Sequence, residues 1–174
     1  ITLIKRKVVF KVKKLNIIIG KSGSGKTSLL KSILEKENNT KSLFPLNFKP
    51  KNLVYIDQKF ITSALLVKEM LEFFEVTDDL KFKKTLKQFG IDYDEFFTKP
   101  LDKISGGELQ RIMISMAIVS KGNVILLDEP TSALDNKLSK TVFSYLRKIS
   151  SKKLLIIVSH DNSMLTKDDN IITI

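Results

Sequence analysis

Short aliphatic runs recur along the chain, separated by longer segments in which apolar residues have helical spacing. Four largely apolar runs predict strands at 15–19, 53–56, 124–127 and 154–158, and those at 15–19 and 124–127 are expected to be buried. A last short strand is expected at 171–174, and a looser alternation at 8–12 predicts an additional edge strand. Strands rich in Ile, Val and Leu that alternate with helices indicate an α/β fold with a mostly parallel sheet.

Helical spacing predicts the elements between these strands. After the first strand, four apolar residues share one helix face: Leu29, Leu30, Ile33 and Leu34. Further helices are predicted after Gly106-Gly107 and at about 137–149. Residues 38–52, rich in Pro, Asn and Lys, predict a loop. The segment from about 62 to 103 is helical and acidic, which predicts a small helical lobe beside the sheet.

Length and composition narrow the class of protein. The chain has 174 residues, which predicts one domain or one domain with a small lobe. With 43% hydrophobic and 28% charged residues, the composition is that of a soluble globular protein and excludes disorder. The longest apolar run, 154–158, is far shorter than the roughly 18 residues of a membrane-spanning helix. The first residue is Ile, which leaves open that the sequence begins inside a longer reading frame.

The absence of cysteine excludes disulfides, thiolate metal sites and a cysteine nucleophile, and a cytosolic address is expected. The formal net charge is +11, and it lies in the first third: residues 1–59 hold fourteen basic and three acidic side chains. This field suits a polyanionic small ligand, nucleic acid or anionic lipid headgroups. Because 27 of the 30 basic residues are Lys, a generally lysine-rich composition is an equal alternative.

A phosphate-binding motif follows the first predicted strand. The pattern G-x-x-x-x-G-K-[ST] is matched by Gly20, Lys21, Ser22, Gly23, Ser24, Gly25, Lys26 and Thr27, and Ser28 completes the predicted nucleotide-binding residues. Glycines let successive backbone N–H groups and the helix N-terminus point at one phosphate chain. Lys26 can place its charge between the β and γ phosphates, and the Thr27 hydroxyl can bind Mg²⁺. The alternative is a glycine-rich turn that caps a helix, but strand, spacing, Lys and hydroxyl all favour phosphate binding.

Two carboxylates follow the predicted strand 124–127, at the end where open α/β sheets bind ligands. Asp128 suits Mg²⁺ coordination. Glu129 can face the γ-phosphate, where a carboxylate can orient or deprotonate the attacking water. An acidic pair after a strand is by itself more often a satisfied turn, but after a complete phosphate loop it favours hydrolysis.

The order of further motifs carries a family resemblance. Ile104-Ser105-Gly106-Gly107-Glu108 precedes the run from Leu126-Leu127-Asp128-Glu129-Pro130 through Thr131-Ser132-Ala133-Leu134-Asp135, and His160 follows. From about residue 8 to 174 the chain resembles the ATP-binding cassette (ABC) ATPase family. The resemblance implies a P-loop NTPase core with a mostly parallel sheet, a reduced antiparallel β lobe and a small helical lobe. It also implies a single domain over 1–174, with a nucleotide-binding core at 1–59 and 104–174 and a helical subdomain at about 60–103.

The same resemblance assigns roles to residues outside the phosphate loop. In such cassettes, the residues that match Ser105, Gly106 and Gly107 contact the γ-phosphate held by another subunit. Gln58 resembles the glutamine that links Mg²⁺ and the attacking water to the helical lobe, so the implied metal ligands are Thr27, Gln58 and Asp128. His160, the only histidine, resembles the switch histidine, and the implied catalytic residues are Glu129, His160 and Gln58. Asp135 falls in the family's D-loop.

Each of these residues also has a simpler interpretation. Ser105 and Glu108 form a capping-box pattern, which explains both without a ligand. Without the motif order, His160 would be an ordinary surface residue and Gln58 a loop amide.

The chain departs from the family pattern in several places. The aromatic residue that usually stacks on adenine would precede residue 1, and Phe10 is expected in the core, so weak discrimination among purines is predicted. The stretch from Lys26 to Gln58 is shorter than is typical, Glu108 replaces the commoner Gln, and no regulatory domain is expected after His160.

Two functions are consistent with the resemblance. The first is the ATP-binding and ATP-hydrolysing subunit of an ABC transporter, with ATP and Mg²⁺ as cofactors, at the cytoplasmic face of the membrane. Its expected partners are a second ATPase subunit and transmembrane permease subunits, with no nucleic acid. The alternative is a soluble non-transport ABC ATPase acting on DNA or ribosomes, but the segment between Lys26 and Ser105 lacks the heptads of DNA-repair cassettes.

Two finer expectations concern transport. The residues from 105 to 115 resemble the signature helix of peptide and nickel importers, which is weak grounds for a substrate. By the resemblance, the helical lobe receives a cytoplasmic helix of a membrane subunit. Residues 69–95 hold eight acidic and four basic side chains, which favours a partly basic helix anchored on Phe73, Phe74 or Phe82.

Overall fold

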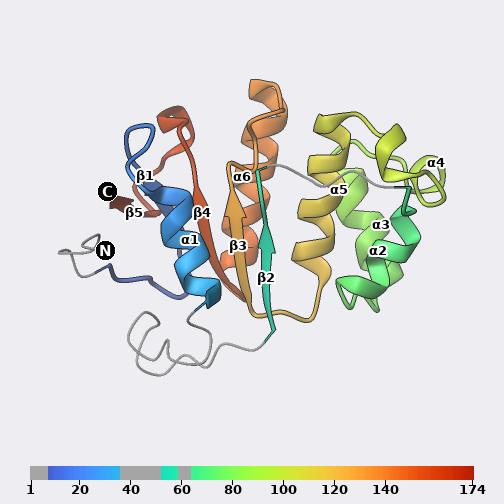
Figure 1. Cartoon of the computed structure of the whole chain (residues 1–174), viewed down its shortest axis with the longest axis horizontal. Helices are drawn as coiled ribbons and strands as arrows, with labels where there is room; N and C mark the ends of the chain where they lie inside the picture. The colour runs from blue at the N-terminus through green and yellow to red at the C-terminus, as the bar shows by residue number, and fades with distance from the viewer. Residues whose placement is uncertain (1–7, 36–51, 59–63) are drawn as a thin grey trace.

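The computed structural model describes residues 8–35, 52–58 and 64–174 (Figure 1). Its centre is a five-stranded sheet in the order β2-β3-β4-β1-β5. The strands are β1 (Leu15–Ile19), β2 (Leu53–Ile56), β3 (Val124–Asp128), β4 (Leu154–Val158) and β5 (Asn170–Thr173). Every neighbouring pair is parallel, so the carboxyl ends of all five strands lie at one edge of the sheet.

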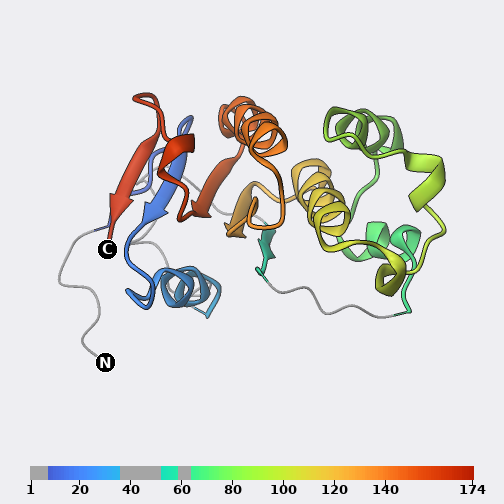
Figure 2. The same ribbon diagram turned by 90° about the horizontal axis from the view of Figure 1, so that it is seen from above.

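Helices connect the strands and cover both faces of the sheet. The α-helices are α1 (Lys26–Glu35), α2 (Val67–Phe73), α3 (Asp79–Gln88), α4 (Tyr93–Phe96), α5 (Gly106–Val119) and α6 (Asn136–Ser150). Two short 3₁₀ helices are η2 (Leu101–Lys103) and η3 (Asn162–Met164). Figure 2 shows α1 on one face of the sheet and α5 with α6 on the other. No helix in the described part of the chain is long and apolar enough to cross a membrane.

The alternation of side chains along the strands creates two hydrophobic cores. Ile125 and Leu127 of β3 face α5 and α6, whereas Val124 and Leu126 face α1. Both sets are fully buried. Because both faces of the sheet are covered at its centre, β3 is apolar from 124 to 127 and β4 from 154 to 158, which is why these runs appear without alternation in the sequence.

The short helices α2, α3 and α4 lie to the side of the sheet beyond α5 (Figure 1). Phe82 and Leu86 of α3 are buried in the core that also includes residues of α5. Phe74 and Phe82, two of the three phenylalanines expected as anchors for a partner, are buried, so that expectation was wrong for them. Phe73 is 80% exposed and remains available.

The predicted edge strand at 8–12 is absent, since this segment has no regular secondary structure. Its backbone bonds to side chains rather than to a strand: the N–H of Lys11 donates to Oδ1 of the buried Asn16, and the carbonyl of Val9 accepts from Asn170. Residues 38–51 of the predicted loop and much of the expected antiparallel lobe lie outside the described residues. All strand pairs in the described ranges are parallel, and Leu66 forms an isolated antiparallel bridge with Pro100.

Candidate nucleotide-binding site

The phosphate loop lies between the end of β1 and the start of α1. Gly23 and Gly25 have φ values of 78° and 94°, in the left-handed region that favours glycine. Gly20 is constrained by space, because a Cβ there would clash with the carbonyl oxygen of Ile174. The glycines therefore allow the backbone to wrap around the N-terminus of α1, where free N–H groups favour anions.

The ammonium group of Lys26 is held inside this loop. Lys26 is only 5% exposed, and its Nζ donates hydrogen bonds to the carbonyl oxygens of Gly20 at 3.0 Å and Lys21 at 2.9 Å. The first turn of α1 contains no acidic residue. A buried cation that bonds only to neutral carbonyls leaves a positive potential in the loop, which suits a phosphate.

Asp128 ends β3 and is 2% exposed. Neither of its carboxylate oxygens has a hydrogen bond of ordinary geometry. Burial raises the pKa of Asp128. The nearby Thr27 hydroxyl lowers it, the charge of Asp57 raises it, and the charges of Lys31 and Lys26 lower it. Because buried carboxylates normally have partners, two unpartnered oxygens near a hydroxyl fit a site for a divalent cation.

Hydrogen bonds join Glu129 to Val158 at the end of β4 and to His160 shortly after it. Its φ of 51° is unusual for a residue with a side chain, and its N–H donates to the carbonyl of Val158 at 3.1 Å. Oε2 of Glu129 accepts from the N–H of His160 at 3.4 Å, and Nε2 of His160 lies 3.1 Å from Oε1. Burial raises the pKa of Glu129, and His160 opposes this increase. A raised pKa gives this carboxylate the higher proton affinity that a general base needs.

The Ser105–Glu108 pattern forms the capping box predicted from the sequence. The N–H of Ser105 donates to Oε2 of Glu108 at 3.1 Å, and its hydroxyl donates to the same oxygen, which lowers the pKa of Glu108. Gly106 and Gly107 begin α5 at the edge where the strands end, on the β2 side of the sheet (Figure 1). The helix N-terminus therefore lies apart from the phosphate loop of the same chain.

The remaining predicted residues differ in their positions and contacts. Gln58 follows β2 and is exposed. The neighbouring Asp57 forms an ion pair of 3.5 Å with Lys31 of α1. Asp135 accepts from the N–H of Leu138 and caps α6, so a structural role explains it. Phe10 is 1% exposed, which confirms that it is a core residue and cannot stack on a base.

One residue at the site was not identified from the sequence. Gln110, 2% exposed on α5, donates from Nε2 to the carbonyl of Glu129 at 3.0 Å and to Oγ of Ser132 at 3.3 Å. Its Oε1 accepts from the N–H of Ala133 at 3.2 Å. An amide on a helix face that is otherwise apolar was the available signal, because a buried amide needs partners.

A parallel sheet with a phosphate loop after its first strand and an acidic pair after another strand defines a P-loop nucleotide-binding protein. Residues 7–132 match the family described as "ABC transporter", and the chain belongs to this family. The expected family and the α/β fold class are thereby confirmed.

Individual relatives include transport proteins. The chain is 32% identical over 170 residues to "Zinc import ATP-binding protein ZnuC" of Rickettsia conorii, covering 94% of this chain and 72% of that protein. It is 36% identical to "Spermidine/putrescine import ATP-binding protein PotA" of Mycoplasma mycoides, and the match covers 89% of this chain and 49% of that protein. For "Nisin transport ATP-binding protein NisT" of Lactococcus lactis, the identity is 28% and the coverage 94% and 31%. The chain thus spans half or less of the last two proteins.

Solved structures support the fold. "Dimeric Structure of MJ0796, a Bacterial ABC Transporter Cassette" superposes with a TM-score of 0.70 at 21% identity, covering 89% of this chain and 78% of that one. "RNase-L Inhibitor" gives a TM-score of 0.74 at 24% identity, covering 94% and 32%. At these identities the likeness concerns the fold alone.

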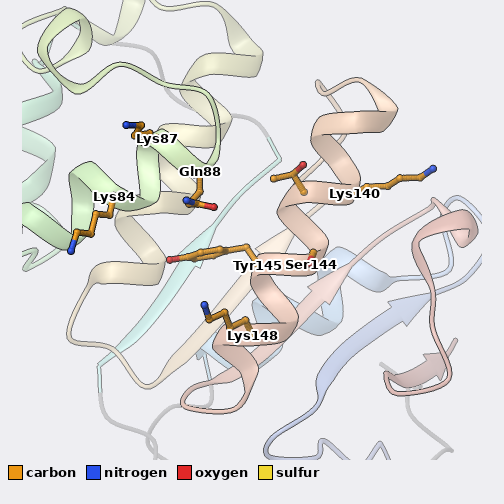
Figure 3. Close-up of a pocket in the computed structure, with 8 residues that line it drawn as sticks. Lys84, Lys87, Gln88, Lys140, Ser144, Tyr145 and Lys148 are labelled. Carbon is orange, nitrogen blue, oxygen red and sulfur yellow. The ribbon is translucent and has the colours of Figure 1, made fainter.

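A basic groove of about 740 Å³ lies between α3 and α6 (Figure 3), and none of the residues that line it is a predicted site residue. It is lined by Lys84, Lys87, Gln88, Lys140, Thr141, Ser144, Tyr145 and Lys148. Tyr145 reaches from α6 toward α3 and packs edge-on against Phe89, whereas Lys140 extends away from α3. The ring of Tyr145 therefore serves helix packing.

Proposed function

We propose that this chain binds and hydrolyses ATP with Mg²⁺ and powers solute transport in an ABC transporter through nucleotide-driven closure of a dimer. The observation that carries this proposal is the buried Asp128, whose unpartnered oxygens lie close to Thr27. Glu129, bound to His160, lies directly beside it. A cation site and a base at the end of one strand are what hydrolysis at a phosphate loop requires.

Phosphate binding, metal binding and proton transfer are assigned to different residues in this proposal. Backbone N–H groups of 20–28 bind the phosphates, and Lys26 exchanges its two carbonyl partners for phosphate oxygens. Thr27, Gln58 and Asp128 would hold Mg²⁺, which when bound neutralises phosphate charge. Glu129 accepts the proton of the attacking water, and His160 orients the Glu129 carboxylate.

Two further elements complete the proposal. Ser105, Gly106 and Gly107 act on the nucleotide of a second subunit, because they begin a helix that lies apart from the phosphate loop of their own chain. The chain forms a single ABC ATPase domain, with its core at 1–59 and 104–174 and a helical subdomain at about 60–103. The lateral position of α2, α3 and α4 in Figure 1 supports this division.

Transport is favoured by the names of the relatives, which describe import of zinc and of spermidine or putrescine, and transport of nisin. Because these cargoes differ in charge and size, they indicate the reaction but no solute, and the peptide and nickel group stays a hypothesis. The partners would be a second ATPase subunit and membrane-spanning permease subunits, which would hold the chain at the cytoplasmic face of the membrane.

The second candidate is a non-transport ABC ATPase that acts on nucleic acid or ribosomes. The lysine-lined groove between α3 and α6 is the observation that favours it, because lysines bind phosphate backbones. Two features weigh against it: Lys140 points away from α3, and Tyr145 is packed against Phe89 rather than free to stack on a base.

The test compares two lysines of α1. Lys26→Ala should weaken ATP binding by about 10- to 100-fold, the value of a charge-assisted bond of about 1.5–3 kcal/mol. Lys31→Ala, which removes an exposed lysine paired with Asp57, is the matched control and should bind ATP normally. Wild-type hydrolysis should stop when EDTA removes Mg²⁺.

Equal ATP binding by both variants, or hydrolysis that continues in EDTA, would contradict the proposed chemistry. A parallel titration with single-stranded RNA and DNA separates the two functions. Tight nucleic-acid binding that Lys84→Gln and Lys148→Gln abolish would favour the second candidate over transport.

A further inference from the structure

The side chain of Gln110 joins α5 to the segment that contains Glu129. Its three hydrogen bonds use both ends of the amide: Nε2 binds the carbonyl of Glu129 and the hydroxyl of Ser132, and Oε1 binds the N–H of Ala133. At 2% exposure, water cannot replace these partners. All three bonds go to residues 129–133, so this buried amide fixes the distance between α5 and that segment.

Glu129 needs such support because of its backbone conformation. A residue with a side chain in the left-handed region costs roughly 1–3 kcal/mol and persists only where its surroundings determine it. At φ 51°, the N–H of Glu129 is fixed by Val158, and its carbonyl is fixed by Gln110 and by the N–H of Ser132. Gln110 is the only one of these partners that comes from α5.

A second contact brings α5 against the same segment. A Cβ at Gly107 would lie 2.9 Å from the carbonyl oxygen of Ala133, so the first turn of α5 touches the residue whose N–H is bound by Gln110. The start of α5 and the residues 129–133 therefore form one packed unit.

We propose that Gln110 is a positioning residue for hydrolysis: it holds the Glu129 backbone, and hence the Glu129 carboxylate, at a fixed place relative to the N-terminus of α5. The proposal rests on the proposed function, in which Glu129 is the base. It assigns no contact between Gln110 and nucleotide. Loss of the amide should lower kcat and leave ATP binding intact. The reason is that the three side-chain hydrogen bonds of Gln110 all go to residues 129–133 and none goes to the phosphate loop.

Two substitutions separate positioning from simple packing. Gln110→Met keeps the length of the side chain and removes the donor and the acceptor. Gln110→Glu keeps the shape, but its carboxylate places an acceptor against the carbonyl of Glu129. When protonated, this carboxyl can donate again, and burial favours the protonated form. Ser115→Ala is the matched control, since Ser115 is buried on the same helix and its hydroxyl bonds to Arg111.

The first readout is ATP hydrolysis by the whole chain. Gln110→Met should lower kcat by about 10²-fold, with KM and the ATP Kd within about twofold of wild type. Gln110→Glu should be similarly slow at pH 8 and recover part of its kcat as the pH falls, whereas wild-type kcat falls. A kcat within twofold of wild type for Gln110→Met, or the same loss in Ser115→Ala, would overturn the proposal.

The second readout is amide hydrogen exchange, which needs no activity. In Gln110→Met, the N–H of Ala133 should exchange at least about tenfold faster than in wild type, because it loses its acceptor. Unchanged protection at Ala133 would overturn the positioning role. A wild-type chain that hydrolyses no ATP would instead refute the proposed function, while the exchange result would still decide whether Gln110 holds the segment.

Discussion

Nε2 of His160 lies 3.1 Å from Oε1 of Glu129, although 31 positions separate the two residues in the chain. The parallel pairing of β3 with β4 explains this contact, because Asp128 and Val158 are paired and the chain leaves both strands at the same edge. The imidazole is half-exposed, whereas the carboxylate is 12% exposed. His160 is therefore accessible to solvent while it contacts a largely buried carboxylate.

Glu129→Gln should retain ATP binding and lower hydrolysis by about 10²- to 10⁴-fold, the usual contribution of a general base. The amide keeps the shape of the side chain and loses only the basic oxygen. Phosphate release and binding of a fluorescent ATP analogue measure the two effects separately. Near-normal turnover would remove Glu129 from the mechanism.

His160→Ala should shift the acidic limb of the kcat profile to higher pH. Burial already raises the pKa of Glu129 above the ordinary 4.5, and His160 opposes the increase. Removing His160 therefore raises this pKa further, so the base is protonated at a higher pH. Profiles of kcat against pH for the variant and wild type test this sign, and a shift to lower pH would contradict it.

Asp128→Asn should raise the melting temperature of the ligand-free chain at pH 7. Burial raises the pKa of Asp128, so its contribution to stability is present at low pH and lost as the pH rises through the raised pKa. Removing the ionised group should therefore raise the melting temperature, and each 1 kcal/mol gained corresponds to about 2–4 °C for a chain of this size. The gain should vanish near pH 3.

Asp169→Asn is the control with the opposite sign. Burial acts to raise the pKa of Asp169, but its bonds with Arg147 and Thr166 outweigh burial and lower it. Its stabilisation is present above the ordinary pKa of 3.8 and is lost as the pH falls through the lowered value. This variant should therefore melt lower than wild type at pH 7. If both variants melted lower at pH 7, the account of Asp128 would be wrong.

The two glycines that begin α5 should differ in their effect on stability. In Gly107→Ala the new Cβ would lie 2.9 Å from the carbonyl of Ala133, and a backbone atom cannot move away cheaply. Gly106→Ala has nothing within 4 Å and should be neutral or slightly stabilising. Thermal unfolding should show a loss of about 1–3 kcal/mol for Gly107→Ala only.

Phe73→Ser should weaken recovery of membrane subunits with the tagged chain by about tenfold or more, since an exposed aromatic residue is a typical anchor. Ile171→Ser is the control, since Ile171 is a 45% exposed residue on β5. Unchanged assembly of the Phe73→Ser variant would show that Phe73 does not anchor the membrane subunits.

Charge reversal at Glu72 should weaken assembly most at low salt, because it removes electrostatic steering. Glu75 and Asp79 are less suitable, since they bond to Asn52 and Tyr93.

Local sequence determined much of the fold and the centre of the site. Three strands, β1, β2 and β4, have the predicted bounds, because short, largely apolar runs between turn residues indicate strands of a covered sheet. The phosphate loop was predictable because its glycines, Lys26 and Thr27 are close in sequence, so local backbone geometry brings them together. Asp128 and Glu129 were predictable as a pair because they end an apolar run.

Tertiary packing alone decided the rest. Segment 8–12 alternates like a strand, but its backbone bonds to Asn16 and Asn170 instead of to a strand. Phe73 and Phe82 look alike in the sequence, yet only the packing of α3 shows that Phe82 is in the core. The links of Glu129 to His160 and to Gln110 join residues that are distant in the chain. Such contacts follow from strand order and helix packing, which local periodicity does not specify.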